Sequence, residues 1–315
     1  MPAVSVIVPT CNRVAYLRSA LLSVERQMFR DFELLVLDDG SSDGTLDFLR
    51  GYRPPFPFRW FSHQGKERSF LRNLGAREAR GELLAFLDDD DEWTPEKLES
   101  QVEFLGRYPE IGLCHSRTVV IDAEGRESPQ ETALHRNLYV ELCGRGHSYA
   151  DLAYSCLMFT STAVVRRSAF EKVGGYDERF CQKEDLDLYL RLSLVSTIGC
   201  VPKELVRYRS HPGGSGAGLG EAHIIVNQNH LEAIACDPAR DLDHAAERAL
   251  VFSTARCHYV AGRNAEALRT LGRMSPGSLA FLARPRHVLF MAKACVKLLL
   301  GWISGKETLT DATAR

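Results

Sequence analysis

Four consecutive aspartates, Asp88 to Asp91, follow the apolar run Leu83 to Leu87, and Trp93 comes almost directly after them. Carboxylates this close cannot all be packed into a core, because like charges repel and each loses hydration on burial. Their oxygens are the ligands that Mg²⁺ and Mn²⁺ prefer, and such ions usually help to hold phosphates. A solvated acidic loop is the alternative. Because the run leaves a strand of buried character, the sequence favours a metal site.

The elements that position these aspartates alternate between strands and helices. Apolar strands are predicted over 4–8, 32–37 and 83–87, and helices over 14–28, 45–50, 69–80 and 95–108. The strands are hydrophobic on both faces, as in a parallel sheet covered by helices. Ligands of such sheets bind beyond the carboxyl ends of the strands. We therefore expect one nucleotide pocket, formed by the polar clusters that follow the strands, at 9–13, 38–43 and 88–91.

The rest of the chain predicts a mixed region followed by helices. Residues 122–150 are polar and are expected to form a loop or flap, and 213–220, with five glycines in eight positions, a flexible loop. A helical hairpin is expected over 243–273, similar to one tetratricopeptide repeat. The other expected elements are a strand region at 111–121, strands at 160–165 and 198–206, and helices at 166–173, 184–194 and from 222 onward.

Composition narrows the functional class. The 315 residues carry a net charge of −2, which gives no reason to expect nucleic-acid binding. Nine cysteines without a C-x-x-C pair favour reduced thiols in the cytoplasm over a disulfide framework or a zinc site. The chain starts directly with a strand, so no signal peptide is expected, and no run of 18 uncharged apolar residues predicts a spanning helix.

The C-terminal stretch 287–303 is apolar apart from Lys293 and Lys297, which are one helical turn apart. Between Arg263 and Lys306 there are eight Lys or Arg residues and one acid, Glu266. This pattern is typical of a helix that lies in a membrane interface, here on the inner face of the membrane. A basic-capped helix docked on the catalytic domain fits it equally well.

Seven motifs occur in order along the chain: Val-x-Val-Ile-Val-Pro-Thr-x-Asn-Arg at 4–13, Asp-Asp-Gly-Ser-x-Asp at 38–43, Arg-Asn-x-Gly at 72–75, the aspartate run with Trp93, Gly-Gly-Tyr-Asp-Glu at 174–178, Glu-Asp-x-Asp-Leu at 184–188 and Tyr-Arg-x-His at 208–211. Over about residues 3–215 the chain resembles the family 2 glycosyltransferases, which are inverting enzymes of the α/β GT-A fold. The resemblance implies a catalytic domain over 1–220, with a nucleotide-binding half at 1–110 and an acceptor-side half at 111–220, and a helical region over 221–315.

The resemblance implies a nucleotide-diphosphate sugar across the sheet edge. Asp39 would accept a hydrogen bond from the uracil ring N–H, so the donor is expected to be a UDP- or dTDP-sugar. Pro9 and Thr10 would lie against the base and ribose, although Pro9 also ends a strand. The remaining donor contacts are expected from Asn12, Arg13, Arg68, Arg72, Asp88, Asp89 and His211. For Arg68 and for Arg72, a surface salt bridge is the alternative to a contact with the nucleotide sugar.

The same resemblance implies roles for the metal and for catalysis. Asp88 and Asp90 match the D-x-D motif, and Asp90 is the expected ligand of Mn²⁺ or Mg²⁺, with His211 approaching the metal or the diphosphate. Asp91 and Trp93 would face the sugar or acceptor. Inversion needs a base opposite the leaving phosphate. Asp185 is the expected base and Glu184 its rival.

The expected activity is transfer of a sugar to a hydroxyl of a saccharide or lipid-linked saccharide, in the assembly of cell-surface polysaccharide. Two alternatives stay open. A nucleotidyltransferase that makes sugar nucleotides would carry a G-x-G-x-R loop after the first strand, where this chain has Pro9 to Arg13 without glycine. A non-catalytic sugar-nucleotide-binding protein would be expected to lose the carboxylates, which are all present.

Overall fold

The protein is described by a computed structural model over residues 1–143, 147–156, 158–211, 220–236, 244–274 and 279–303. The chain divides into two compact units. The first unit comprises Met1–Ser148 and Cys156–Gly216, and the second comprises Tyr149–Ser155 and Ala217–Arg315. The sequence-based division at residue 220 did not anticipate that 149–155 joins the helical unit. The glycine-rich stretch 213–220, expected to be a flexible loop, lies outside the described residues except for its last position.

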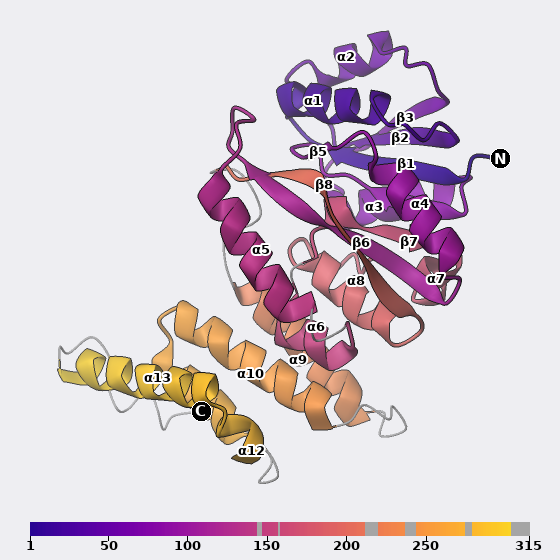
Figure 1. The fold of residues 1–315 in the computed structure, drawn as a ribbon. Coiled ribbons are helices and arrows are strands. Elements are labelled where there is room, and N and C mark those ends of the chain that lie inside the picture. Colours follow the sequence, from indigo (N-terminus) through magenta and orange to yellow (C-terminus); the bar gives the residue numbers. More distant parts are fainter. Residues whose placement is uncertain (144–146, 157, 212–219, 237–243, 275–278, 304–315) are drawn as a thin grey trace. The chain divides into compact units, whose positions relative to one another are not determined.

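The first unit is built on one mixed sheet, in which the described residues form eight strands in the order β3-β2-β1-β4-β7-β6-β8-β5 (Figure 1). Four neighbouring strands are parallel, namely β3 (Phe58–Ser62), β2 (Phe32–Asp38), β1 (Val4–Thr10) and β4 (Leu83–Phe86). The short β7 (Val164–Arg166) runs antiparallel to β4 and to β6 (Ile111–Ile121). β6 is parallel to β8 (Thr197–Arg209), whose other neighbour is the antiparallel β5 (Glu92–Trp93).

Helices cover both faces of the parallel strands (Figure 1). On one face, the valines of β1 pack with α1 (Val14–Glu25), α2 (Thr45–Gly51) and α4 (Lys97–Arg107). On the other face lies α3 (Glu67–Glu78). Here Gly75 allows a close approach, because a Cβ at this position would lie 2.5 Å from Ile7 Cγ2. Every residue of β1 and β2 is buried, which confirms the interpretation of these apolar runs as central strands.

Two predicted elements between residues 122 and 165 are wrong. Residues 129–143 form the helix α5 (Pro129–Cys143) instead of a loop. α5 lacks a regular apolar stripe, so hydrophobic periodicity could not reveal it, and it is anchored through Thr132, whose hydroxyl accepts a hydrogen bond from the Val120 N–H. Residues 160–162 form a 3₁₀ turn before β7, closed by the Ala163 N–H and the Thr160 carbonyl, instead of extending the strand.

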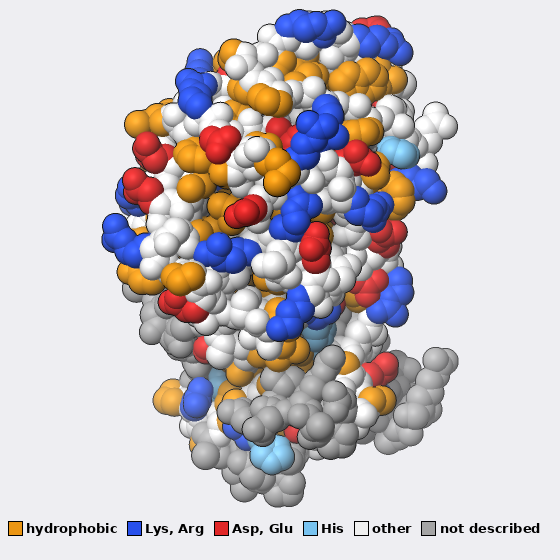
Figure 2. Space-filling model, turned by 90° about the vertical axis from the view of Figure 1, so that its right-hand side faces the viewer, with side chains coloured by type: hydrophobic (Ala, Val, Ile, Leu, Met, Phe, Trp, Pro, Cys, Tyr) orange, Lys and Arg blue, Asp and Glu red, His pale blue; other side chains and the backbone are white. Residues whose placement is uncertain are grey.

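Two helices of the first unit follow β7. These are α7 (Arg167–Lys172) and α8 (Glu184–Ser193), which agree with the expected helices. The face of the molecule in Figure 2 shows Lys and Arg interspersed with Asp and Glu. Such mixing of charge agrees with the near-neutral net charge.

The second unit is helical. It comprises α6 (Tyr149–Tyr154), α9 (Glu221–Cys236), α10 (His244–Val260), α11 (Asn264–Gly272), α12 (Leu279–Leu282) and α13 (Pro285–Ile303). α10 and α11 form the expected hairpin, and the turn between them uses Gly262 at φ +78°. Among the described helices, none is both long and apolar enough to cross a membrane.

Lys97, at the start of α4, lies in the core next to Trp93. Its side chain is fully buried, and its Nζ is 3.8 Å from the centroid of the Trp93 ring and makes no hydrogen bond within the described part of the chain. Burial lowers the pKa of Lys97 to about 7. The usual pKa of a lysine is 10.5, so the buried Lys97 does not reduce the free energy of unfolding at a pH above this value. The destabilisation grows as the pH falls below 10.5 and is complete below about 7.

We expect Lys97→Met to stabilise the fold by about 1–3 kcal/mol at pH 6, since replacing a buried charge by an apolar group of similar volume is often stabilising. Chemical denaturation at pH 6 and pH 9 would measure this, with a larger gain at pH 6. The exposed Lys172→Met serves as the control and should change stability little. A loss of stability in Lys97→Met at both pH values would contradict this account of the buried ammonium.

Candidate active site at the carboxyl ends of the parallel strands

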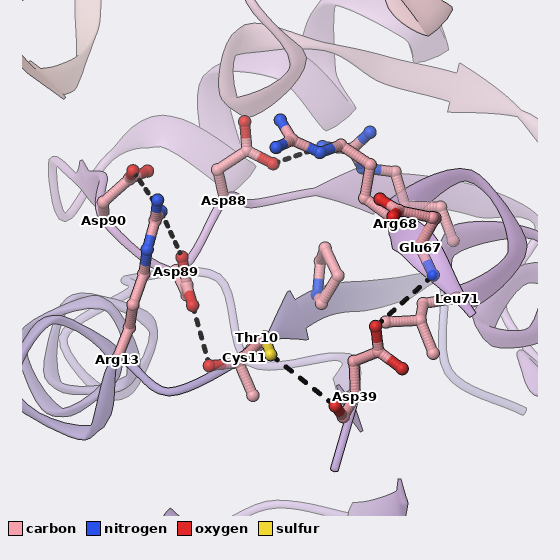
Figure 3. A pocket seen from close by; sticks show the side chains of 12 residues that line it. Thr10, Cys11, Arg13, Asp39, Glu67, Arg68, Leu71, Asp88, Asp89 and Asp90 are labelled. Carbon is pink, nitrogen blue, oxygen red and sulfur yellow. Dashed lines mark hydrogen bonds and ion pairs between the residues drawn. The ribbon is translucent and has the colours of Figure 1, made fainter. Parts of the chain in front are cut away.

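A pocket of about 280 Å³ opens where β1, β2 and β4 end and α3 begins (Figure 3). It brings together nine of the residues expected from the sequence: Pro9, Thr10, Arg13, Asp39, Arg68, Arg72, Asp88, Asp89 and Asp90. Its other lining residues, which the sequence analysis did not single out, are Cys11, Glu67 and Leu71. The three polar clusters that follow separate strands therefore meet at one edge of the sheet, as predicted.

The two aspartates at the end of β2 have different surroundings. Asp38 is fully buried and accepts hydrogen bonds from the Gly40 and Ser41 N–H groups and from the Ser62 hydroxyl. Asp39 lines the pocket, and its carboxylate accepts the Lys66 N–H at 2.9 Å and, as Figure 3 shows, the Glu67 N–H at 3.3 Å at the start of α3. Asp38 thus shapes the turn, while Asp39 is held in the wall of the pocket.

Asn12 does not line the pocket, unlike its neighbours. It adopts a left-handed conformation at φ 53°, which Asn tolerates better than most residues. Its side-chain carbonyl accepts the Ser42 N–H at 2.7 Å, and its own N–H donates to the Ser41 hydroxyl at 2.8 Å. Asn12 is expected from the sequence to contact the nucleotide sugar. In the structure its side chain instead ties the end of the first strand to the loop that carries Asp39.

Arg72 joins the aspartate run to the start of α8. Its side chain is 1% exposed, and its guanidinium donates to Asp88 at 2.5 Å and to Glu184 at 2.6 Å. A buried guanidinium needs such opposite charges, since an unpaired buried charge is strongly destabilising. Arg68 lies farther from Glu184, at 4.0 Å, and is one-third exposed. Arg72 is therefore a buried structural cation at the pocket, and Arg68 is the more accessible one.

Asp89 is buried between Thr10 and Arg13. Its carboxylate accepts the Thr10 hydroxyl at 2.7 Å and Arg13 Nη1 at 3.2 Å (Figure 3). Burial, together with the negative charge of Asp90, raises the pKa of Asp89 to about 7. Thr10 and Arg13 are therefore held in place by a carboxylate that the protein keeps poorly hydrated.

Asp90 and His211 meet although they lie 121 residues apart in sequence. His211 Nε2 is 3.0 Å from Asp90 Oδ2, and the same oxygen accepts Arg13 Nη1 at 2.6 Å. The Tyr16 ring packs beside the imidazole, with ring centroids 5.1 Å apart. An anionic oxygen and an imidazole nitrogen thus share one spot, which the cationic Arg13 also contacts.

These two side chains fit a divalent cation held jointly with a ligand. Across the described ranges, no group of three or more His, Cys, Asp or Glu residues could hold a metal ion. Mg²⁺ is usually bound through one or two carboxylates together with substrate phosphates and waters, instead of by an all-protein cage. Asp90 with His211 is such a partial ligand set, so the residues present fit an ion that is completed by phosphate oxygens.

Asp91 and Trp93, expected to face the sugar or acceptor, point into the protein instead. Asp91 is 2% exposed and accepts the Ser161 hydroxyl at 2.5 Å and the Arg209 N–H at 2.8 Å. Trp93 is 3% exposed and donates its indole N–H to the Ser161 carbonyl at 2.9 Å. The expectation for Asp91 and Trp93 is therefore wrong. Both residues anchor the loop that carries the aspartate run, and neither lines the pocket.

The acidic pair at the start of α8 is split by its surroundings. Glu184 is buried and takes the ion pair with Arg72. Asp185 is half-buried and accepts the N–H of the adjacent Leu186 at 2.8 Å. Burial, together with the charge of Glu184, raises the pKa of Asp185 to about 6. The pKa of Asp185 therefore lies close enough to neutral pH for its carboxylate to exchange a proton there.

Arg209 is a positioning residue that the sequence analysis missed, although it lies inside the motif that ends in His211. Its buried guanidinium donates to the carbonyls of Asp90 at 2.8 Å and Asp122 at 3.0 Å, and to the Glu92 carboxylate at 2.6 Å. It also lies 5.0 Å from the centroid of the Tyr16 ring. Arg209 thus fixes the backbone of Asp90 relative to the strand end that carries His211.

We expect Arg209→Lys to weaken binding of a divalent cation at Asp90 and His211 about 10- to 100-fold, which is typical for loss of a residue that orients metal ligands. The measurement is a titration with Mn²⁺, and the half-saturating concentration should rise. Arg207→Lys is the matched control, since Arg207 lies on the same strand and pairs with Glu92 and Glu127 at the surface. An unchanged metal requirement in Arg209→Lys would leave this residue only a role in stability.

Sequence comparison matches residues 5–174 to the model of the family "Glycosyl transferase family 2". An uncharacterized glycosyltransferase of Rickettsia felis is 27% identical over 210 residues, which cover 67% of this chain and 33% of the relative. An uncharacterized glycosyltransferase of Nostoc sp. is 31% identical over 180 residues, which cover 54% of this chain and 52% of the relative. The chain thus spans about a third of the length of the first of these relatives and half that of the second.

The fold is similar to solved structures over nearly the whole chain. S. aureus TarS 1-349 in complex with UDP-GlcNAc matches with a TM-score of 0.67 at 19% identity, covering 93% of this chain and 87% of TarS 1-349. The mannosyltransferase PcManGT from Pyrobaculum calidifontis, in complex with GDP-Man and Mn²⁺, matches with a TM-score of 0.61 at 18% identity. This match covers 97% of this chain and 88% of the PcManGT chain. These matches confirm the expected GT-A fold. The family model, which covers more than half of the sequence, shows that the chain belongs to glycosyl transferase family 2.

Proposed function

We propose that the protein is an inverting glycosyltransferase that uses a UDP- or dTDP-sugar together with Mn²⁺ or Mg²⁺. The observation that carries the proposal is that His211 lies 3.0 Å from Asp90, which lines a pocket whose wall also contains Asp39. A carboxylate, an imidazole and a base-binding carboxylate at one sheet edge suit a nucleoside diphosphate with its cation.

The arrangement of the pocket supports the following contacts with the nucleotide-sugar donor. Asp39, held by the Lys66 N–H, accepts the ring N–H of uracil or thymine, and Pro9 and Thr10 lie along the base and ribose. Asp88 or Asp89 accepts the ribose hydroxyls, and Arg68 supplies positive charge toward the phosphates. The UDP-GlcNAc in TarS and the GDP-Man with Mn²⁺ in PcManGT support a sugar nucleotide as the ligand class.

Asp90 and His211 are the residues that would hold the cation. When bound, a divalent ion neutralises the negative charge that builds on the diphosphate as the sugar leaves. Arg13 already contacts Asp90 at 2.6 Å and also contacts Asp89, so its guanidinium can contribute positive charge at the same place. Arg209 keeps the backbone of Asp90 in position through its carbonyl.

Asp185 acts as the base. Its carboxylate takes the proton of the acceptor hydroxyl as that oxygen attacks the anomeric carbon from the side opposite the diphosphate, and the configuration inverts. Glu184, the neighbour of Asp185 in sequence, remains ion-paired with the buried Arg72, which also contacts Asp88 in the donor pocket. We propose a saccharide or lipid-linked saccharide as the acceptor and cell-surface polysaccharide assembly as the process.

A thermal-shift screen of nucleotide sugars, with and without Mn²⁺, tests the proposal. UDP- or dTDP-sugars should raise the melting temperature only with the metal, because a ligand at 100 times its Kd stabilises the fold by about 2.7 kcal/mol. GDP- and ADP-sugars serve as matched controls and should stabilise less. Equal stabilisation by purine and pyrimidine nucleotides would contradict the role of Asp39, and none by any nucleotide would contradict the donor class.

A further inference from the structure

α13 carries an exposed apolar stripe. Val288, Leu289 and Val296 are 47%, 55% and 53% exposed. Leu289 and Val296 are two helical turns apart and therefore share one side of the helix. Pro285 and Ala292, which are also exposed, lie on the same side. Large apolar side chains clustered in this way on one helix differ from the scattered exposed residues that are ordinary on protein surfaces.

The opposite side of α13 is packed within the helical unit. Ala294 and His287 are fully buried, and Phe290 and Met291 pack against a cluster that includes Phe252 of α10. The Tyr259 ring of α10 lies 4.3 Å from Lys297 Nζ. α13 is thus docked through one side, and the apolar stripe is a second, separate surface.

Positive charge borders the stripe. Lys293 and Lys297 are exposed and lie one turn apart beside it, and Arg284 is exposed just before the helix begins. The sequence contains no Asp or Glu between Glu266 and Glu307. An apolar strip beside charge of a single sign is typical of a helix that lies in the plane of a membrane interface.

We propose that this lipid-binding face, formed by Pro285, Val288, Leu289, Ala292 and Val296 with Lys293 and Lys297 at its border, binds the surface of an anionic lipid bilayer. The positive charge of the two lysines favours an anionic bilayer over a second copy of the chain. A second copy of the chain docked through the same face would bring its lysines close to those of the first, and like charges across an interface oppose association. The inference rests on α13 and not on the proposed glycosyl transfer.

The test uses the full chain with vesicles of phosphatidylcholine alone or mixed with phosphatidylglycerol, measured by co-sedimentation. The protein should bind the anionic vesicles preferentially, and less so at high salt. Leu289→Glu should weaken binding about tenfold or more, since it removes apolar burial and adds repulsion. Lys293→Gln should weaken binding to the anionic vesicles about fivefold. Leu22→Glu is the matched control, because Leu22 is 44% exposed but lies on α1, and it should bind as the unmodified chain does.

Three outcomes would overturn the proposal. The first is that the same fraction of the protein sediments with anionic vesicles as without them. The second is binding that Leu289→Glu and Lys293→Gln both leave unchanged. The third is a dimer in analytical ultracentrifugation that Leu289→Glu dissociates, which would make a second copy the occupant. Circular dichroism checks the fold of each variant, and Lys293→Gln keeps the test valid should Leu289→Glu fail to fold.

Discussion

Asp185→Asn is expected to lower the transfer rate about 10²- to 10⁴-fold, the usual contribution of a general base. The substitution keeps the size of the side chain and its acceptor for the Leu186 N–H, so the start of α8 should stay intact. Binding of the nucleotide should persist, since Asp185 does not line the donor pocket. Steady-state kinetics with a saccharide acceptor, together with calorimetry of UDP binding, would measure both effects.

Glu184→Gln is the matched comparison for the base. Glutamine still accepts a hydrogen bond from Arg72 but removes one of the two carboxylates that pair with this buried guanidinium. The expected result is a lower melting temperature, because a buried charge loses a partner, with a smaller loss of transfer than in Asp185→Asn. If Asp185→Asn kept full transfer while Glu184→Gln lost it, the base would be Glu184.

The pH dependence gives a second measurement of the same role. In the proposed mechanism the carboxylate form of Asp185 is the active form, and its pKa is raised to about 6 by burial and by Glu184. As the pH falls below 6 the base becomes protonated, so kcat/KM, which reports the free enzyme, should fall about tenfold per pH unit. It should level off above pH 7. The residual activity of Asp185→Asn should lack this acidic limb.

Asp90→Asn is expected to remove the metal-dependent part of donor binding and to lower transfer about a thousandfold. The amide keeps an oxygen for Arg13 but loses the negative charge that a divalent cation requires, and such a cation contributes several kcal/mol to charge stabilisation. His211→Ala should have a smaller effect in the same direction, since it removes the neutral ligand. Calorimetry of UDP binding with Mn²⁺ and with a chelator would measure the loss.

The control for Asp90→Asn is Asp47→Asn, which changes an exposed carboxylate of α2 that pairs with Arg50. It should bind UDP and Mn²⁺ as the unmodified protein does. The melting temperature of Asp90→Asn without ligand should not fall much, because one of several crowded negative charges is removed. Full metal-dependent binding in Asp90→Asn would refute its role as the ligand.

The sequence predicted the pocket because its position follows from local features. β1, β2 and β4 are apolar runs that end in polar residues, and parallel strands place such ends along one edge. This was sufficient to bring Asp39 and Asp88 to one pocket without knowledge of any side-chain contact. The order of the motifs then supplied the family, which the comparison with the family model confirms.

The orientation of individual side chains could not be predicted in the same way. Asp91 turns inward because Ser161, 70 residues away, donates to it, and Arg209 reaches Asp90 across 119 residues. Such contacts depend on the packed tertiary structure and leave no local pattern. The helix α5 escaped prediction for a related reason, since its polar sequence lacks the apolar period that marks a helix packed against a core.

A crystal structure with UDP and Mn²⁺, in which the anomalous signal of manganese locates the ion, tests the central claim most directly. The account predicts an anomalous peak between Asp90, His211 and the diphosphate, with the uracil against Asp39. A diphosphate bound elsewhere, or a manganese peak away from Asp90 and His211, would contradict it.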